Sequence, residues 1–226
     1  MSSQHPLMWF QDGIGREIHL REIAAIDRHI SSYGCKRLLQ LGGPSLCNTF
    51  PEFHYIHYDE SHNFSVPGHN ICGDFTRLGI LSDCIDTVVV PHLQEIMLGF
   101  PSVLPEIMRV LRHEGTVVVY GFNPLSLWGM QRILGFSNIV PWCSRFYSAG
   151  TLIKKFEDND FVYIARQDLY PGIHSEFPLV HKVSDFLENF NILSMGAVYS
   201  LVFKKQASTM TLNTEKSKYY SIPSGA

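Results

Sequence analysis

Two apolar runs in the middle of the chain show no alternation between polar and apolar positions. Residues 85–90 end in three consecutive valines and stop at Pro91, and residues 116–121 form the second run. Strands without alternation are covered on both faces, as in a parallel sheet. Residues 102–112, between the two runs, carry a helical pattern. Strand, crossover helix and strand form the unit of an open α/β sheet, whose ligands bind at the carboxyl ends of the strands.

The remaining pattern predicts five further strands and several helices. Residues 16–32 form the first helix, because apolar residues such as Ile23, Ile26 and Ile30 fall on one stripe of it. The other strands are expected at residues 36–41, 53–58, 69–72, 161–167 and 196–204, and the other helices at residues 125–134, 149–157 and 179–189. Residues 135–148 and 169–176 have the composition of loops.

The composition of the 226-residue chain is that of one globular domain with a full core. We assign residues 1–205 to that domain, including the helix over residues 16–32, and expect residues 206–226 to form a flexible polar tail. The formal charge of −3 gives no strong nucleic-acid signal. The sequence does not indicate the oligomeric state.

The five cysteines are odd in number and form no CxxC pair, which favours a reducing compartment. No signal peptide opens the chain, and no apolar run approaches the roughly 20 residues that a membrane span needs. We therefore expect a cytoplasmic protein. Although the chain has 11 histidines, no set of ligands has a recognisable metal spacing. His54 and His57 lie on a predicted strand, where an odd offset places them on opposite faces. No metal site is predicted.

A resemblance to a known family follows from the central segment. The sequence DFTRLGILSDCIDTVVVPHLQE, followed by LPEIMRVLRHEGTVVVYG, resembles the central half of type-11, class I S-adenosylmethionine-dependent methyltransferases. The spacing from Leu78 to Asp86 matches the family pattern without a gap. The resemblance is clear over residues 36–122 and looser up to residue 205. It implies a Rossmann-like fold with an open, seven-stranded, mostly parallel sheet, an antiparallel last strand and helices on both faces.

The loop after the first predicted strand departs from that family. The family shows an acid and then Gly-x-Gly-x-Gly, whose glycines let the backbone approach the cofactor. Here Gln40 replaces the acid, Pro44 the second glycine and Leu46 the third, while Gly42 keeps its register. The resemblance implies that Gln40, Gly42 and Gly43 contact the amino-acid end of S-adenosylmethionine. A plain turn at this glycine pair is the alternative.

Three further residues are candidates at the ends of the next strands. By resemblance, Asp59 chelates the ribose hydroxyls and Asp74 accepts a hydrogen bond from the adenine amino group; a solvated carboxylate and an Asx turn are the respective alternatives. His92 follows the fourth predicted strand, where an imidazole can contact the cofactor or act as a general base. Its alternative is a histidine that only lines the cleft. Asp86 is interpreted as structural.

The segment GFNP at residues 121–124 follows the fifth predicted strand. Asn123 is expected to cap the helix after it, and facing the transferred methyl group is its alternative role. The segment GFNPLSLWGMQRIL resembles a small bacterial subgroup of methyltransferase-domain proteins. The catalytic residues are left open, with His92 and Asn123 as candidates.

The function that the resemblance implies is methyl transfer from S-adenosylmethionine to a small or medium acceptor. Such a transfer requires donor and nucleophile to be held in line, and a strong base is not obligatory. The alternative is a methyltransferase-like scaffold that has lost activity and binds or regulates a partner, which Gln40, Pro44 and Leu46 favour. A nicotinamide oxidoreductase is disfavoured, because no G-x-G-x-x-G follows the first strand.

Overall fold

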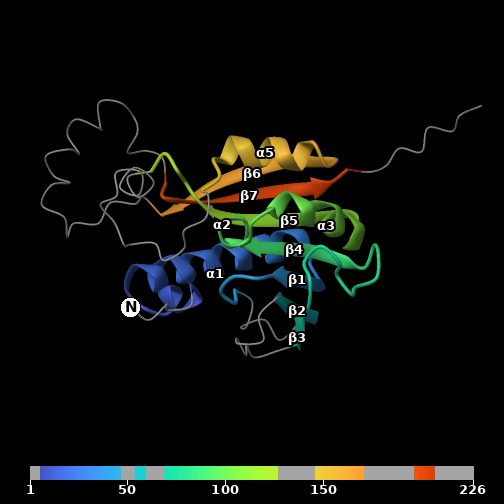
Figure 1. Ribbon diagram of the computed structural model, residues 1–226, viewed down its shortest axis with the longest axis horizontal. Helices are drawn as coiled ribbons and strands as arrows, with labels where there is room; N and C mark the ends of the chain where they lie inside the picture. Colours follow the sequence, from blue (N-terminus) through green and yellow to red (C-terminus); the bar gives the residue numbers. More distant parts are fainter. Residues whose placement is uncertain (1–5, 47–53, 60–68, 127–145, 171–195, 207–226) are drawn as a thin grey trace, which may run out of the picture.

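One seven-stranded sheet runs through the computed structural model, in the order β3-β2-β1-β4-β5-β7-β6 (Figure 1). The structure describes residues 6–46, 54–59, 69–126, 146–170 and 196–206. The strands are β1 (Arg37–Leu41), β2 (His54–Asp59), β3 (His69–Cys72), β4 (Ile85–Pro91), β5 (Leu111–Phe122), β6 (Phe161–Tyr170) and β7 (Val198–Lys205). Only β7 runs antiparallel to its neighbours β5 and β6. The predicted fold class is confirmed.

Helices cover both faces of this sheet. The long helix α1 (Gly13–Tyr33), preceded by the short η1 (Pro6–Gln11), lies on one face. The opposite face carries α2 (Leu93–Ile96), η2 (Phe100–Val103), α3 (Leu104–Val110) and α5 (Ala149–Glu157) (Figure 1). Among the described residues, no helix has the length and apolar character needed to cross a membrane.

The absence of alternation in the two central strands reflects two separate cores. In β5, Val117 and Val119 pack with α3 and α5, whereas Val118 and Tyr120 pack against α1. All seven residues of β4 are buried. Because each face of these strands has its own helical layer, apolar residues are required at every position.

Several predicted boundaries are wrong. The predicted helix over residues 102–112 is divided between η2 and α3 and ends at Val110, because Leu111 is already extended and pairs with Ile85. β5 therefore begins before residue 116. Leu169 and Tyr170 belong to β6 rather than to a loop, since Tyr170 pairs with Val198 of β7.

The first helix is present as predicted, but it begins three residues earlier, at Gly13, and ends one residue later, at Tyr33; Gly34 follows in the left-handed region, and its N–H donates to the Ile30 carbonyl. Leu125 and Ser126, the first two residues of the helix expected after Asn123, form a turn and a bend instead. The structure does not describe the predicted helix over residues 179–189, the remaining residues 127–134 of the expected helix, or residues 207–226 of the expected tail.

Asp86 is structural, as the sequence suggested. Its Oδ2 accepts hydrogen bonds from the backbone N–H groups of Lys36 and Arg37, both at 2.8 Å. Its Oδ1 lies 3.0 Å from Nε of Arg112. One carboxylate thus joins the start of β1 to the starts of β4 and β5.

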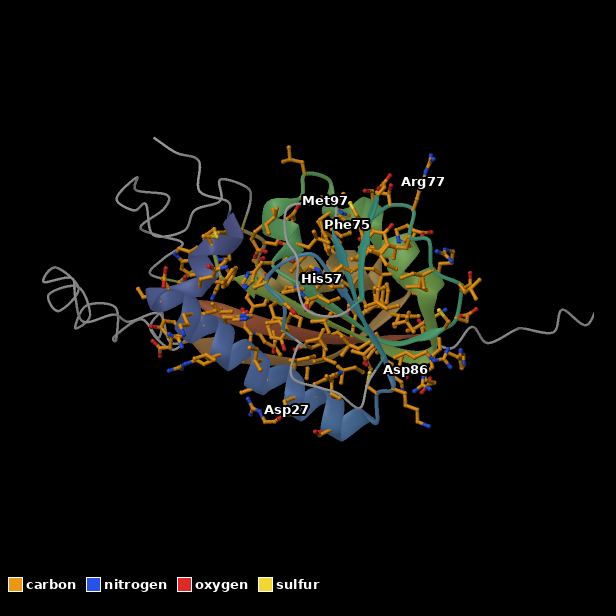
Figure 2. The ribbon with its side chains drawn as sticks, turned by 90° about the horizontal axis from the view of Figure 1, so that it is seen from below. Asp27, His57, Phe75, Arg77, Asp86 and Met97 are labelled. Atoms are coloured by element: carbon orange, nitrogen blue, oxygen red, sulfur yellow. The ribbon has the colours of Figure 1, made fainter. Side chains whose placement is uncertain are left out.

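Replacing Asp86 with Ala should leave two partly buried N–H groups without an acceptor and lower the free energy of unfolding by about 2 to 3 kcal/mol. Asp27, an exposed acid on α1, provides the matched control, and its alanine variant should change stability by less than about 0.5 kcal/mol. Figure 2 labels both residues. Urea denaturation measures the two losses, and equal losses would contradict this role of Asp86.

Candidate functional site

The loop after β1 is held by the side chain of Gln40. This side chain is fully buried, and its Nε2 donates to the carbonyl oxygens of Gly42 and Pro44, each at 2.8 Å. Its Oε1 accepts from the N–H of Leu46 at 3.0 Å. An aspartate could not make these contacts, because an ionised carboxylate has no donor and would face two carbonyl oxygens. Gln40 therefore organises the loop through its own amide group.

Two glycines give this loop its path. Gly42 and Gly43 both have positive φ, 60° and 69°. The N–H of Gly42 donates to the carbonyl of Tyr58 on β2 at 2.8 Å. A Cβ on Gly43 would overlap the Pro91 carbonyl oxygen, and one on Gly42 would lie 3.1 Å from the Leu93 side chain. The loop is thus packed directly against the carboxyl end of β4, which a larger residue would push away.

The two predicted carboxylates follow the neighbouring strands at the same edge. Asp59 ends β2 and pairs with Cys72 of β3, although its side chain lies outside the described part of the structure. Asp74 is exposed just beyond β3, and its Oδ1 accepts from the N–H and the hydroxyl of Thr76, at 2.7 and 2.6 Å. These two hydrogen bonds lower the pKa of the Asp74 carboxyl. Asp74 is therefore ionised, and it forms the Asx turn that was its alternative interpretation.

His92 is fully buried rather than exposed along an open cleft. It has a φ of 55°, its Nε2 lies 2.7 Å from Oε1 of Glu22, and its Nδ1 lies 3.8 Å from Oε2 of Glu95. The ring stacks on Phe122 with centroids 4.3 Å apart, and Phe10 lies 5.2 Å away. The imidazole therefore has two carboxylate neighbours, from α1 and α2.

Burial and charge oppose each other in this cluster. Burial alone would lower the pKa of His92, but Glu22 and Glu95 together raise it above its ordinary value. Burial raises the pKa of Glu95 to about 7, although His92 and the Phe122 N–H act in the opposite direction. That N–H donates to Oε1 of Glu95 at 2.8 Å. Glu95 therefore titrates near neutral pH.

Asn123 is buried at the end of β5. Its Oδ1 accepts from the N–H of Leu125 at 3.0 Å, which is the turn-forming contact expected of a capping asparagine. Its Nδ2 donates to the carbonyl of Gly196, just before β7, at 3.1 Å. The side chain thus joins the loop after β5 to the start of β7.

Glu22 and Glu95 were not predicted from the sequence. A signal for Glu22 was present, because it lies four residues from both Ile18 and Ile26 on the buried stripe of α1. A charged residue on an apolar stripe needs a buried partner. The partner, His92, is 70 residues away in sequence, so only the fold brings the two together.

A separate pocket of about 220 Å³ lies between α1 and the strands β5, β6 and β7. Its polar lining includes Arg28, His29, Arg166 and Gln167. Burial lowers the pKa of His29 to about 4, so this imidazole is neutral at physiological pH. No predicted site residue lines this pocket. Within the described ranges, no group of three or more metal-ligating side chains is placed to hold a metal ion.

Solved structures share this architecture. A Thermotoga maritima S-adenosylmethionine-dependent methyltransferase, described as a possible histamine N-methyltransferase, superposes with a TM-score of 0.64 and 16% identity, over 89% of this chain and 100% of the other. An Archaeoglobus fulgidus S-adenosylmethionine-dependent methyltransferase gives 0.58 and 18%, over 82% and 94% of the two chains. A chain from the Haloferax volcanii complex between the Trm112 activator and a methyltransferase gives 0.60 and 14%, over 90% and 98%.

No protein-family model and no curated protein matches the sequence. At identities of 14 to 18%, the three structures show that this chain has the class I methyltransferase fold. A fold supports many functions, so the chemistry must be argued from the site.

Changing Gln40 to Glu tests the loop contact. The variant keeps the size of the side chain but removes both donors to the Gly42 and Pro44 carbonyls, so unfolding should become easier by roughly 2 to 4 kcal/mol. Gln11→Glu, at an exposed glutamine, is the matched control and should be nearly neutral. Thermal melting at pH 7.5 measures both. An unchanged melting temperature for Gln40→Glu would show that the amide contacts do not hold the loop.

The buried Glu95 should make stability depend on pH. Its pKa is raised from 4.5 to about 7 on folding, so its contribution is complete below pH 4.5 and is lost as the pH rises through 7. Between pH 6.5 and 8.5 the loss should be about 1 kcal/mol, or roughly 2 to 4 °C in melting temperature. His29, with a pKa of about 4, does not titrate in this window.

Glu95→Gln should reduce this dependence, because the amide does not titrate and can still accept from the Phe122 N–H, and the slope that remains belongs to His92, whose raised pKa acts in the same direction. Exposed Glu157→Gln should keep the slope of the parent protein. Calorimetry across this pH range measures all three proteins. A parent slope of zero, or the same slope in Glu95→Gln, would contradict the role of Glu95.

Proposed function

We propose that this protein binds S-adenosylmethionine at the carboxyl ends of β1 to β4 and transfers its methyl group to a small or medium acceptor. The observation that carries the proposal is the loop at residues 42–46, which is held by Gln40 and packed against the corner where β4 ends. In this fold, ligands bind where the carboxyl ends of the strands meet. The shared architecture of the solved methyltransferases supports the same place.

The residues present fit this cofactor. Gly42 and Gly43 supply a backbone loop without side chains, and ionised Asp74 supplies acceptor oxygens beyond β3. Asp59, at the end of β2, would take the ribose hydroxyls, and Asp74 the adenine amino group. When bound, the cofactor supplies a methyl group on a sulfonium, which makes that carbon electrophilic. His92 would stand at the reactive end, because it follows β4.

Gln40 should lower the affinity for the amino-acid end of S-adenosylmethionine. Its amide is used within the loop, so the cofactor amino group is not paired with a charge at this position. A charge-assisted hydrogen bond is about twice as strong as a neutral one. Binding should therefore depend more on the adenosine half than it does in proteins that keep the acid.

The second candidate function is a scaffold that binds a ligand or a partner without methyl transfer. Pro44 and Leu46, which replace family glycines, are buried and favour it. The two functions differ in one observable: a scaffold gives no S-adenosylhomocysteine when S-adenosylmethionine is incubated with the protein and candidate acceptors.

The remaining assignments are part of the same proposal. We place the protein with the type-11-like bacterial proteins that carry Gly-Phe-Asn-Pro after β5, and we treat residues 1–205 as one domain. Cys35 and Cys84 are free thiols, which suits a cytoplasmic enzyme. A small-molecule acceptor is the expected partner.

Titration of the purified chain with S-adenosylhomocysteine tests the proposal. The parent protein should bind it in the micromolar range and should not bind NAD. Asp59→Ala and Asp74→Asn should each weaken binding by roughly five- to a hundredfold, since each loses about 1 to 3 kcal/mol of hydrogen bonding. Asn at position 74 keeps an acceptor for the Thr76 turn, so the local structure is retained.

Asp27→Ala on α1 should bind as the parent does. Isothermal titration calorimetry measures all four proteins. If neither S-adenosylhomocysteine nor S-adenosylmethionine binds, the proposed function is wrong; if both bind but Asp59→Ala is unaffected, the placement of the ribose is wrong.

A further inference from the structure

Two buried carboxylates flank His92 at the ends of β4 and β5. Glu22 comes from α1 and Glu95 from α2, and both side chains are 0% exposed. Each uses one oxygen, Glu22 toward His92 and Glu95 toward the Phe122 N–H. The second oxygen of each, Oε2, has no hydrogen-bond partner within the described parts of the chain, and for Glu95 the described donor Nδ1 of His92 lies 3.8 Å away, beyond hydrogen-bond distance. A buried carboxylate oxygen without a donor is costly, which points to a ligand that supplies one.

The charges around this pair do not balance. Every described ion pair of Glu22 or Glu95 is made with His92, and neither carboxylate contacts a lysine or arginine within the described ranges. Burial lowers the pKa of His19, so this neighbour brings no compensating charge at neutral pH. Tyr199 is neutral, because burial raises its pKa well above its ordinary value. Above the pKa of about 7 of Glu95, the two carboxylates exceed the single positive charge that His92 can carry, which leaves room for one more cation.

Aromatic rings surround His92, Glu22 and Glu95, which together form the His92 corner. Phe122 stacks on His92 and on Phe146, with centroid distances of 4.3 and 5.4 Å. The ring centroid of Trp9 lies 6.0 Å from that of Phe122, and the ring centroid of Phe10 lies 5.2 Å from that of His92. Aromatic faces attract cations, particularly where water is excluded. The rings and the carboxylates therefore favour the same kind of ligand.

This corner adjoins the reactive end of the proposed cofactor site. With the adenosine over β2 and β3, the sheet order puts the other half of the cofactor near β1 and β4. Gly43 packs against Pro91 and Gly42 against Leu93, the residues on either side of His92. Glu95 then reaches across to the end of β5. A nucleophile beside His92 would face the methyl group.

Resting on the proposed function, we infer that Glu22 and Glu95 form the acceptor subsite and that the acceptor is an amine, bound as its ammonium ion. A carboxylate acceptor would be repelled by the pair, and a hydroxyl would bring no compensating charge. In the reaction, an ammonium N–H bond breaks and its proton moves to Oε2 of Glu95. The amine lone pair then forms a bond to the methyl carbon as the carbon–sulfur bond breaks and its electrons pass to sulfur. The products are a methylated ammonium ion and S-adenosylhomocysteine.

Sinefungin provides a direct probe, because it carries an amine where S-adenosylmethionine carries its methyl sulfonium. Calorimetry compares its affinity with that of S-adenosylhomocysteine, which has no cation there. At pH 8 the parent should bind sinefungin roughly tenfold or more tightly, as a charge pair between buried groups predicts. This preference should fall several-fold at pH 6, below the pKa of about 7 of Glu95, because a protonated carboxyl no longer attracts the cation.

Variants locate the effect. Glu95→Gln and Glu22→Gln should each reduce the preference for sinefungin over S-adenosylhomocysteine to less than about threefold. Exposed Glu157→Gln should keep the full preference. The pH comparison uses the parent protein alone, so it remains decisive even if a variant does not fold.

The outcomes separate the two proposals. Tight S-adenosylhomocysteine binding without a preference for sinefungin overturns the amine subsite and leaves the cofactor site standing. A preference that persists in both variants also overturns the subsite. If neither ligand binds, the cofactor site and the subsite that rests on it both fall.

Discussion

The contact between His92 and Glu22 is the constraint on which the rest of the site depends. It joins α1 to the end of β4 across 70 residues of sequence, at 2.7 Å and without exposure to solvent. A buried ion of either sign is tolerated only with a partner, so the helix and the strand end are tied together electrostatically as well as by packing. Because Glu95 lies on the other side of the imidazole and accepts from the Phe122 N–H, the end of β5 is fixed to the same group.

In the loop after β1, buried polar groups are satisfied by a neutral amide rather than by an ion pair. Gln40 provides two donors and one acceptor, and the loop takes all three. The glycine pair then lets this loop lie against Pro91 and Leu93, so the proposed cofactor site and the His92 corner form one continuous edge. The shape of this loop is therefore held by an uncharged amide whose hydrogen bonds stay within the loop.

Most of the fold could be predicted from the sequence, because it depends on local patterns. The all-buried β4 and the helical stripe of α1 are visible as hydrophobic periodicity. The break at Leu111 was missed because its extended conformation depends on pairing with Ile85, a contact distant in sequence. The site could be predicted only in outline. Strand ends identify Asp74 and His92, but the partnership of His92 with Glu22 comes from packing, which no local spacing encodes.

The most direct test of the account is a map of backbone amide shifts in the ¹⁵N-labelled chain when S-adenosylhomocysteine is added. The account predicts that the signals of Gly42, Gly43 and Leu93 change progressively and saturate together, because these residues form the shared edge. Signals from the pocket beneath α1, such as that of Gln167, should remain in place. Shifts confined to that pocket, or no shifts at millimolar ligand, would contradict the placement of the cofactor at the carboxyl ends of β1 and β4.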